Sequence, residues 1–210
     1  MYIPKHFDES KVDCLHELMR DRPLATLVTL SSHGLNADHL PFHLSETVDS
    51  LGVLHGHIAR ANPIRSHLIE STEVLAIFQG SDAYITPSWY VTKAETGKVV
   101  PTWNYIVAHA YGTLRFIDDA GWLRAHLEAL VAEHEAAFNS PWRVSDAPPD
   151  FVDKLIGAVV GIEIVITRLL GKWKISQNQP SENKAGVIHG LQQTGTAEAL
   201  DMADFMMRAN

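Results

Sequence analysis

The sequence contains a single cysteine, Cys14, among its 210 residues. One chain therefore cannot form a disulfide or a zinc site of several thiolates, which is typical of a reducing compartment. The longest apolar run, around Ile162–Ile166, is much shorter than the ~20 residues of a membrane-spanning helix. The first ten residues, MYIPKHFDES, include no apolar stretch of the kind that a secretory signal needs. We therefore expect a cytoplasmic protein with no membrane partner.

Basic residues are also scarce, because 17 Lys and Arg face 25 Asp and Glu, for a formal net charge of −8. Non-specific affinity for DNA comes mainly from Lys and Arg at phosphates. The balance argues against a broad DNA-binding surface and leaves a local patch open. The local excess of positive charge lies at Arg168, Lys172, Lys174 and Lys184.

The sequence shows no motif by which side chains alone would catalyse a reaction. There is no Ser-His-Asp arrangement, Walker motif or dinucleotide-binding glycine fingerprint, and His109 has no partnered nucleophile. We predict no catalytic residue, so any chemistry would be carried by a cofactor.

The hydrophobic pattern predicts alternating strands and a few helices. The strands are expected at 24–30, 35–44, 53–58, 74–79, 83–86, 102–117, 161–170 and 172–176. The helices are expected at 8–20, 64–70, 118–138, 150–160 and 181–210, with an interruption near 194–195, and 88–100 is expected to be a loop. This pattern indicates an α+β barrel. Because no linker or repeat divides the chain, we predict one domain, 1–210, with 181–210 as a helical appendage.

The segment Val99–Gly112, VVPTWNYIVAHAYG, carries an unusual group of polar and aromatic residues. Strand alternation places Trp103 and Tyr105 on one face and Asn104 on the other. Aromatic faces and an amide suit a planar, partly polar ligand. An edge strand with a Trp/Tyr core pair is the alternative. Three aromatic residues of the preceding segment 80–90 could line the same ligand pocket, form an oligomer interface or pack in the core: Tyr84, Trp89 and Tyr90.

Six blocks along nearly the whole chain resemble the PaiB-type FMN-binding negative transcriptional regulators. They are MYIPKHF (1–7), LPFHL (40–44), GHIARANP (56–63), FQGSDAYITPSWY (78–90), VVPTWNY (99–105) and GKWKISQN (171–178). The resemblance implies the FMN-binding split β-barrel of pyridoxamine-phosphate-oxidase-like proteins, with peripheral helices. It also implies FMN as cofactor and a homodimer.

The block GHIARANP lies where a strand is expected to give way to a helix. Helix N-termini and a guanidinium suit phosphate, and an asparagine can cap the helix or bind the same phosphate. The alternative is an N-cap beside a surface arginine. The resemblance implies that this corner holds the FMN phosphate, which makes Arg60 and Asn62 candidate cofactor ligands.

Six of the 12 histidines lie between His33 and His67. His55 and His57 share one strand face, and His39 and His43 share another, so a metal site is conceivable. No Asp or Glu is spaced to complete a ligand set, and we predict no metal ligand. We expect His39 and His57 to line the cofactor pocket.

The block GKWKISQN alternates as a strand, with Lys172, Lys174 and Ser176 on one face. Two lysines and a hydroxyl suit a phosphate or a flavin edge, although lysines also protect solvated edge strands. In split-barrel dimers that this chain resembles, C-terminal residues complete the flavin site of the partner. That resemblance implies that Lys174, Ser176, Gln177 and Asn178 contribute to an FMN site.

Two functions are compatible with these features. The leading hypothesis is a homodimeric, FMN-binding negative regulator of transcription, and the alternative is an FMN-dependent oxidoreductase that acts on a small substrate. Direct DNA binding should be weak or depend on a partner. The last expected helix carries Glu198, Asp201 and Asp204 against Arg208, which is the wrong charge for a DNA groove.

Overall fold

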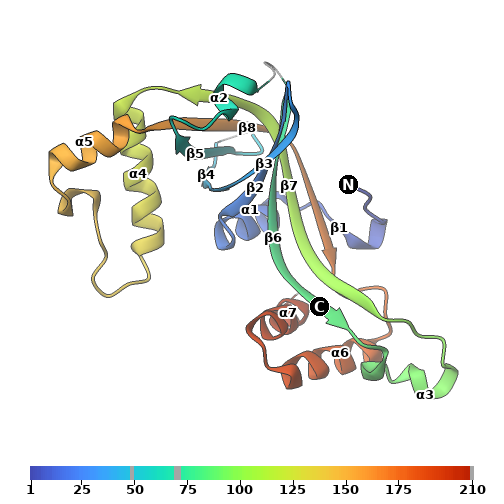
Figure 1. Cartoon of the computed structure of the whole chain (residues 1–210). Coiled ribbons are helices and arrows are strands. Elements are labelled where there is room, and N and C mark those ends of the chain that lie inside the picture. Colours follow the sequence, from blue (N-terminus) through green and yellow to red (C-terminus); the bar gives the residue numbers. More distant parts are fainter. Residues whose placement is uncertain (48–49, 69–71, 209–210) are drawn as a thin grey trace. The chain divides into compact units, whose positions relative to one another are not determined.

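The computed structural model describes residues 1–47, 50–68 and 72–208. The chain forms two compact units, each assembled from segments that are distant in sequence (Figure 1). The first unit comprises Met1–Leu18, Gln79–Ala108 and Leu170–Asn210. The second comprises Met19–Phe78 and His109–Leu169.

The described residues contain an eight-stranded sheet in the order β3-β2-β6-β7-β8-β5-β4, with β1 paired to β8. The given registers are antiparallel, for example Thr26 opposite His39 and His55 opposite Glu163. The strand bounds are β1 Asp8–Glu9, β2 Leu24–Ser31, β3 Gly34–Pro41, β4 His43–Ser45, β5 Val53–Ala59, β6 Glu73–Ile85, β7 Thr102–Ile117 and β8 Val159–Lys174.

The helices lie outside this sheet. Their bounds are α1 Val12–Asp21, α2 Ile64–His67, α3 Thr92–Thr96, α4 Ala120–Glu135, α5 Pro149–Gly157, α6 Ser181–Thr194 and α7 Ala197–Arg208. Short 3-10 turns occur at Lys5–Phe7, Pro87–Trp89 and Val144–Asp146. The start of α4 is set by Asp119, whose carboxylate accepts a hydrogen bond from the Trp122 N–H at 2.7 Å.

Two glycines explain why the predicted strand breaks were wrong. Strands 74–79 and 83–86 are one strand, β6, because Gly80 serves packing: a Cβ there would lie 2.4 Å from Ile106 Cγ1. The strands predicted on either side of Gly171 also form one strand, β8, where a Cβ would lie 2.3 Å from Leu15 Cδ2. A sequence shows the glycine and cannot show which neighbour needs the space.

Other boundaries also differ from the predictions. The strand predicted at 35–44 is divided into β3 and β4. The loop predicted at 88–100 contains α3, and β8 ends at Lys174, because Ser176 has a φ of 64°, outside the strand region. The helix predicted at 64–70 is the single turn α2, and positions 69–70 lie outside the described residues.

The helical tail belongs to the first unit, where α6 and α7 pack against each other (Figure 1). The predicted interruption is confirmed: α6 ends at Thr194 and Gly195 has a φ of 71°. From α7, Met202 and Met206 are buried, and the Phe205 ring contacts Trp173 of β8. The tail therefore contributes to the core of this unit.

The second unit buries Leu54, Ile162 and Ile164 of its sheet. A second cluster joins α4 to α5 through Leu123, Val144, Val152 and Ile156. The prediction of a single domain with an appendage stays a prediction.

Candidate functional site

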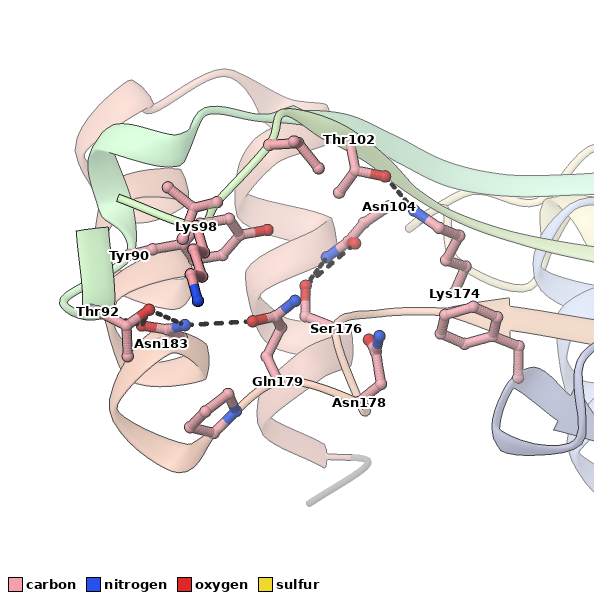
Figure 2. A pocket seen from close by; sticks show the side chains of 14 residues that line it. Tyr90, Thr92, Lys98, Thr102, Asn104, Lys174, Ser176, Asn178, Gln179 and Asn183 are labelled. Carbon is pink, nitrogen blue, oxygen red and sulfur yellow. Dashed lines mark hydrogen bonds between the residues drawn. The ribbon is translucent and has the colours of Figure 1, made fainter. Parts of the chain in front are cut away.

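A cavity of about 310 Å³ in the first unit brings together several of the predicted cofactor residues (Figure 2). Four of them line it: Asn104, Lys174, Ser176 and Asn178. The other lining residues are Phe7, Tyr90, Thr92, Lys98, Val99, Val100, Thr102, Gln179, Pro180 and Asn183. The walls thus come from the segment before β7, the start of β7 and the chain that leads from β8 into α6.

The charge of this cavity is opposite to that of the whole protein. Lys98 and Lys174 supply two ammonium groups, and none of the described residues that line the cavity has a carboxylate. The remaining polar groups are amides and hydroxyls. In a chain with a net charge of −8, this is a local environment that favours an anionic ligand.

Asn104 forms one wall of the cavity from inside the core. Its side chain is fully buried, and its Nδ2 donates to the Ser176 hydroxyl at 3.1 Å. The same amide contacts Met206 Sδ at 3.5 Å. The predicted alternation is confirmed, because the neighbouring Trp103 is 54% exposed. Asn104 therefore faces the cavity, and Trp103 lies on the other face of the strand.

Lys174 lies at the same wall. Its ammonium donates to Thr102 Oγ1 and to the Trp103 carbonyl oxygen, as drawn in part in Figure 2. The ammonium also lies 5.9 Å from the centre of the Phe7 ring. Burial, and then the charge of Lys172, lower the pKa of Lys174. No carboxylate is among these contacts in the described residues.

The far wall is an amide network that the sequence reading missed. Asn183 is 2% exposed, and its Nδ2 donates to Thr92 Oγ1 at 2.9 Å and to Gln179 Oε1 at 3.2 Å. Figure 2 shows the Lys98 side chain directed toward these amides. The missed residues fall in a predicted loop and a predicted tail, where no periodic pattern marks a buried face. The one available signal is the set of uncharged amides after the GKWKISQN block.

Three other predicted residues lie outside this lining. Gln177 Oε1 accepts from the Ile175 N–H at 2.8 Å, and its amide donates to the Trp173 carbonyl, which makes it a turn residue. The Trp103 ring meets Tyr84 edge to face with centres 5.8 Å apart. Lys172 Nζ lies 5.3 Å from the centre of the Tyr105 ring.

Arg60 lies in the second unit at the end of β5, the predicted phosphate corner. Its guanidinium binds both Asp118 oxygens at 2.8 and 2.9 Å and also donates to the carbonyls of Gly157 and Val159. These bonds, first from Arg60 and then from Arg65, lower the pKa of Asp118 to about 2. Through these hydrogen bonds, Arg60 connects Asp118, which follows β7, to the residues at the start of β8.

Asn62 caps the following turn as one alternative predicted: its Oδ1 accepts from the Ile64 N–H at 2.9 Å. Its Nδ2 donates to Asp38 at 3.3 Å. Because α2 has four residues, the argument from a helix N-terminus does not apply at this corner. The role of Arg60 and Asn62 in FMN binding stays a prediction.

The two predicted histidines also lie in the second unit. His39 is exposed on β3. His57 Nδ1 lies 3.2 Å from His126 Nε2 of α4, and burial lowers the pKa of both rings, to about 4 for His126. Within residues 1–47, 50–68 and 72–208, no group of three or more His, Cys, Asp or Glu is arranged to hold a metal ion.

The sequence profile of the family described as "Putative FMN-binding domain" matches residues 1–168. An uncharacterized protein of Emericella nidulans is 39% identical, over 93% of this chain and 92% of its own length. The Bacillus subtilis (strain 168) protein named "Protease synthase and sporulation protein PAI 2" is 29% identical, over 98% of this chain and 96% of its own. The predicted resemblance is therefore confirmed.

Among solved structures, the chain is similar to the FAD and heme binding protein from Mycobacterium smegmatis. The TM-score is 0.57 at 16% identity, over 80% of this chain and 73% of that one. This likeness concerns the fold, and it confirms the predicted class: an α+β split β-barrel with peripheral helices and a helical C-terminal tail. In the part of the chain that the structure describes, no helix has the length and apolar character to cross a membrane.

Proposed function

The chain belongs to the family of FMN-binding domains whose profile matches its first 168 residues, and from this premise we propose that it binds FMN. The observation that carries the proposal is the cavity of the first unit. Its described lining combines two ammonium groups with amides and hydroxyls and has no carboxylate. FMN is a dianionic phosphate monoester joined to a planar ring whose edge accepts and donates hydrogen bonds, so it needs groups of these kinds.

The donor set fits the cofactor. Lys174 and Asn178 bring an ammonium and an amide to one cavity, whose adjacent wall is formed by Asn104 and Ser176, hydrogen-bonded to each other. Its volume of about 310 Å³ is at the lower limit of small-molecule sites, which suits one end of FMN better than the whole molecule. Bound FMN would supply one- and two-electron redox chemistry. The residues named here would bind and orient it.

We propose that the rest of the site is completed in a homodimer. Candidate residues of the first unit that lie next to the cavity lining in sequence are Trp103 and Tyr105 on β7 and Gln177 after β8. The candidate FMN ligands of the second unit are the four predicted residues His39, His57, Arg60 and Asn62. Exposed aromatic side chains support a dimer, because Trp and Tyr are enriched at protein interfaces; Trp103 is 54% exposed and Tyr84 50%.

We propose negative regulation of transcription as the biological role, carried out with a partner. The support is the similarity to a protein whose name refers to protease synthesis and sporulation. The acidic surface of α7, with Glu198 and Asp204 exposed, argues against this helix as a DNA reader.

The experiment that tests the proposal is a titration of the purified protein with FMN, followed by quenching of flavin fluorescence and by the visible spectrum. We expect saturable binding with one FMN per chain and a dimer in sedimentation. A protein that leaves the FMN spectrum and fluorescence unchanged at micromolar concentrations contradicts FMN binding. A monomer that still holds FMN contradicts the shared site. Turnover of a reduced nicotinamide or another small donor by the flavin-loaded protein would favour the alternative, an FMN-dependent oxidoreductase.

A further inference from the structure

A second cavity, of about 410 Å³, lies within the second unit, between the last turns of α4 and the segment 141–145 of the loop that leads to α5 (Figure 1). None of its described lining residues is a candidate FMN ligand. We propose that this cavity binds a small amphiphilic amine, a molecule with an apolar body and one ammonium group. The proposal goes beyond flavin binding and does not rest on it.

The first wall of the cavity is one face of α4. Its residues recur at intervals of three and four positions, the spacing of side chains on the same side of a helix: Glu128, Val131, Ala132, Glu135 and Ala136. The helix thus presents a short apolar strip with a carboxylate at each of two turns.

The second wall is a loop that the fold holds in place. The Trp142 N–H donates to Glu135 Oε2 at 2.8 Å, and the Arg143 N–H donates to Asp146 Oδ2 at 2.9 Å. Val144 is buried in the cluster that joins α4 to α5. Because these contacts form the cavity without a ligand, binding costs little ordering of the chain.

The size and the surface of the cavity suit the apolar part of a ligand. A volume of about 410 Å³ lies within the range of small-molecule sites. Trp142 lines it and is 46% exposed, so a ligand can cover a large area of indole. Pro141, next to Trp142, extends this apolar wall.

The charges at the cavity favour a cation over an anion. Two carboxylates, of Glu128 and Glu135, stand against one guanidinium, of Arg143. Glu128 is exposed, and its carboxylate has no hydrogen bond or ion pair within the described part of the chain, so it is available to a ligand. The segment 120–157 as a whole has six Asp and Glu against three Lys and Arg.

The backbone and the indole add to this preference. The cavity adjoins the C-terminal turns of α4, where unpaired carbonyl groups carry partial negative charge. An ammonium group over the face of Trp142 also gains a cation–π interaction. An anion at the same place would meet Arg143 and would be repelled by both carboxylates and by the helix end.

The experiment compares three probes with similar phenylalkyl bodies and different charges: 4-phenylbutylamine, 4-phenylbutanol and 4-phenylbutyrate. Binding to the full chain is followed in ¹H–¹⁵N NMR spectra at the indole N–H of Trp142. The spectrum of Trp142→Phe identifies this signal among those of the five tryptophans. The backbone amides of Val131 and Ala132 report on the helix wall.

We expect the amine to shift all three signals with a dissociation constant of about 0.1–1 mM, as for a small ligand of ordinary efficiency. The alcohol should bind about three- to tenfold more weakly, because it lacks the charge, and the butyrate more weakly still. High salt should reduce the difference between the amine and the alcohol.

Variants assign this preference to residues. Glu128→Gln should remove most of the preference for the amine over the alcohol. Its matched control is Glu17→Gln, at an exposed position of α1 in the first unit, which should match the wild type. Arg143→Gln should bind the amine at least as tightly as the wild type. Trp142→Ala, followed at the two helix amides, should weaken the amine and the alcohol alike. Melting temperatures and circular dichroism report whether each variant folds.

Four results would overturn the inference. Equal affinity for the amine and the alcohol would mean an apolar surface without charge selection. Tighter binding of the butyrate, lost in Arg143→Gln, would mean an anion site. A Trp142 signal that shifts with protein concentration and with none of the probes would assign the surface to a second copy of the chain. No shift of the three signals at about 10 mM amine would mean that the cavity binds no ligand of this class.

Discussion

In the second unit, arginines pair with carboxylates, whereas in the first unit the lysines of β8 meet neutral partners. The arginine–carboxylate pairs described in the second unit are Arg20–Glu46, Arg60–Asp118, Arg65–Asp118, Arg115–Glu163, Arg124–Asp153 and Arg168–Glu73. In the first unit, Lys172 donates to the Tyr2 carbonyl, and Lys174 donates to Thr102 and the Trp103 carbonyl. The six arginines named here are therefore neutralised by carboxylates of the fold, whereas the contacts given for Lys172 and Lys174 are neutral oxygens.

The difference shows why residue type alone is a weak guide to an anion site. Arginine is the better phosphate ligand by shape, because its planar fork matches two oxygens. The same fork also matches a carboxylate of the chain, and Asp118 takes that place at Arg60. What a cation contacts in the folded protein decides whether it is available to a ligand.

The largest expected effect concerns stability in the second unit. Glu163 is 9% exposed, and it accepts from Arg115 Nε at 2.5 Å and His55 Nε2 at 3.2 Å. Glu163→Ala should lower the free energy of unfolding by about 1.5–3 kcal/mol, the cost of losing buried bonds to charged groups. Chemical denaturation measures it. Asp153→Ala, at an exposed pair with Arg124, should cost much less. Equal losses would mean that the two pairs are not distinguished by burial. FMN affinity should be unchanged in both.

A smaller effect should appear in acid, again in the second unit. His126 is buried against His57, and its pKa is lowered from 6.5 to about 4. The unfolded chain binds this proton at a higher pH than the folded one, so the stability is present above pH 6.5 and is lost as pH falls toward 4.

The free energy of unfolding should therefore fall by about 1–2 kcal/mol between pH 7 and pH 5 because of this ring. Chemical denaturation of the wild type and of His126→Leu at both pH values measures the contribution of this ring. The free energy of unfolding of the variant should depend less on pH, because the variant lacks the titrating imidazole. The same slope in both proteins would assign the acid sensitivity to other groups.

The pair Arg60→Ala and Asp118→Ala tests the comparison at its centre. Both variants should have a lower melting temperature, because Arg60 connects β5 to Asp118, Gly157 and Val159. We expect Arg60→Ala to weaken FMN binding about ten- to a hundredfold, the effect of one lost charge-assisted bond, whereas Asp118→Ala should not weaken it. An FMN affinity of Arg60→Ala within about threefold of the wild type would remove Arg60 from the site.

The smallest expected effect is on DNA. The net charge is −8, and several arginines of the second unit, among them Arg60 and Arg168, are paired with carboxylates, so we expect no broad cationic surface for a duplex. Titration of labelled DNA at physiological salt should show micromolar binding or none, with a shallow salt slope because each phosphate contact contributes about −0.9. Nanomolar, sequence-selective binding would contradict this charge argument and support a direct regulator.

Local patterns predicted much of the fold. The β-rich run Thr102–Ile117 predicted β7 with the bounds that the structure has, and the acidic cap and apolar spacing predicted α4. The predicted breaks at 80–82 and at Gly171 were wrong, because a glycine that ends a strand and a glycine that makes room for a side chain look alike in sequence. Leu15 and Ile106, the side chains that need the room, come from other elements.

The residues of the candidate site also fall into two groups, those that the motifs predicted and those that only the structure revealed. Asn104, Lys174, Ser176 and Asn178, which the motifs predicted, come together at one cavity. The sequence did not predict Lys98 and Asn183, because each lies in a segment without periodicity. Their place in the cavity lining depends on neighbours that are distant in the chain.

The order of amino acids was sufficient for the properties that depend on neighbours along the chain. These include the faces of β7, the break at Gly195, the negative charge and the family motifs. Tertiary structure was needed for properties that depend on which distant groups meet. Arg60 is separated from Asp118 by 58 positions and Lys174 from Thr102 by 72, and folding gives the first cation a carboxylate and the second a hydroxyl. Electrostatic energy depends on distance in space and on burial, so the sequence could name the cations, and only the fold decided which one meets a carboxylate and which one meets neutral oxygens.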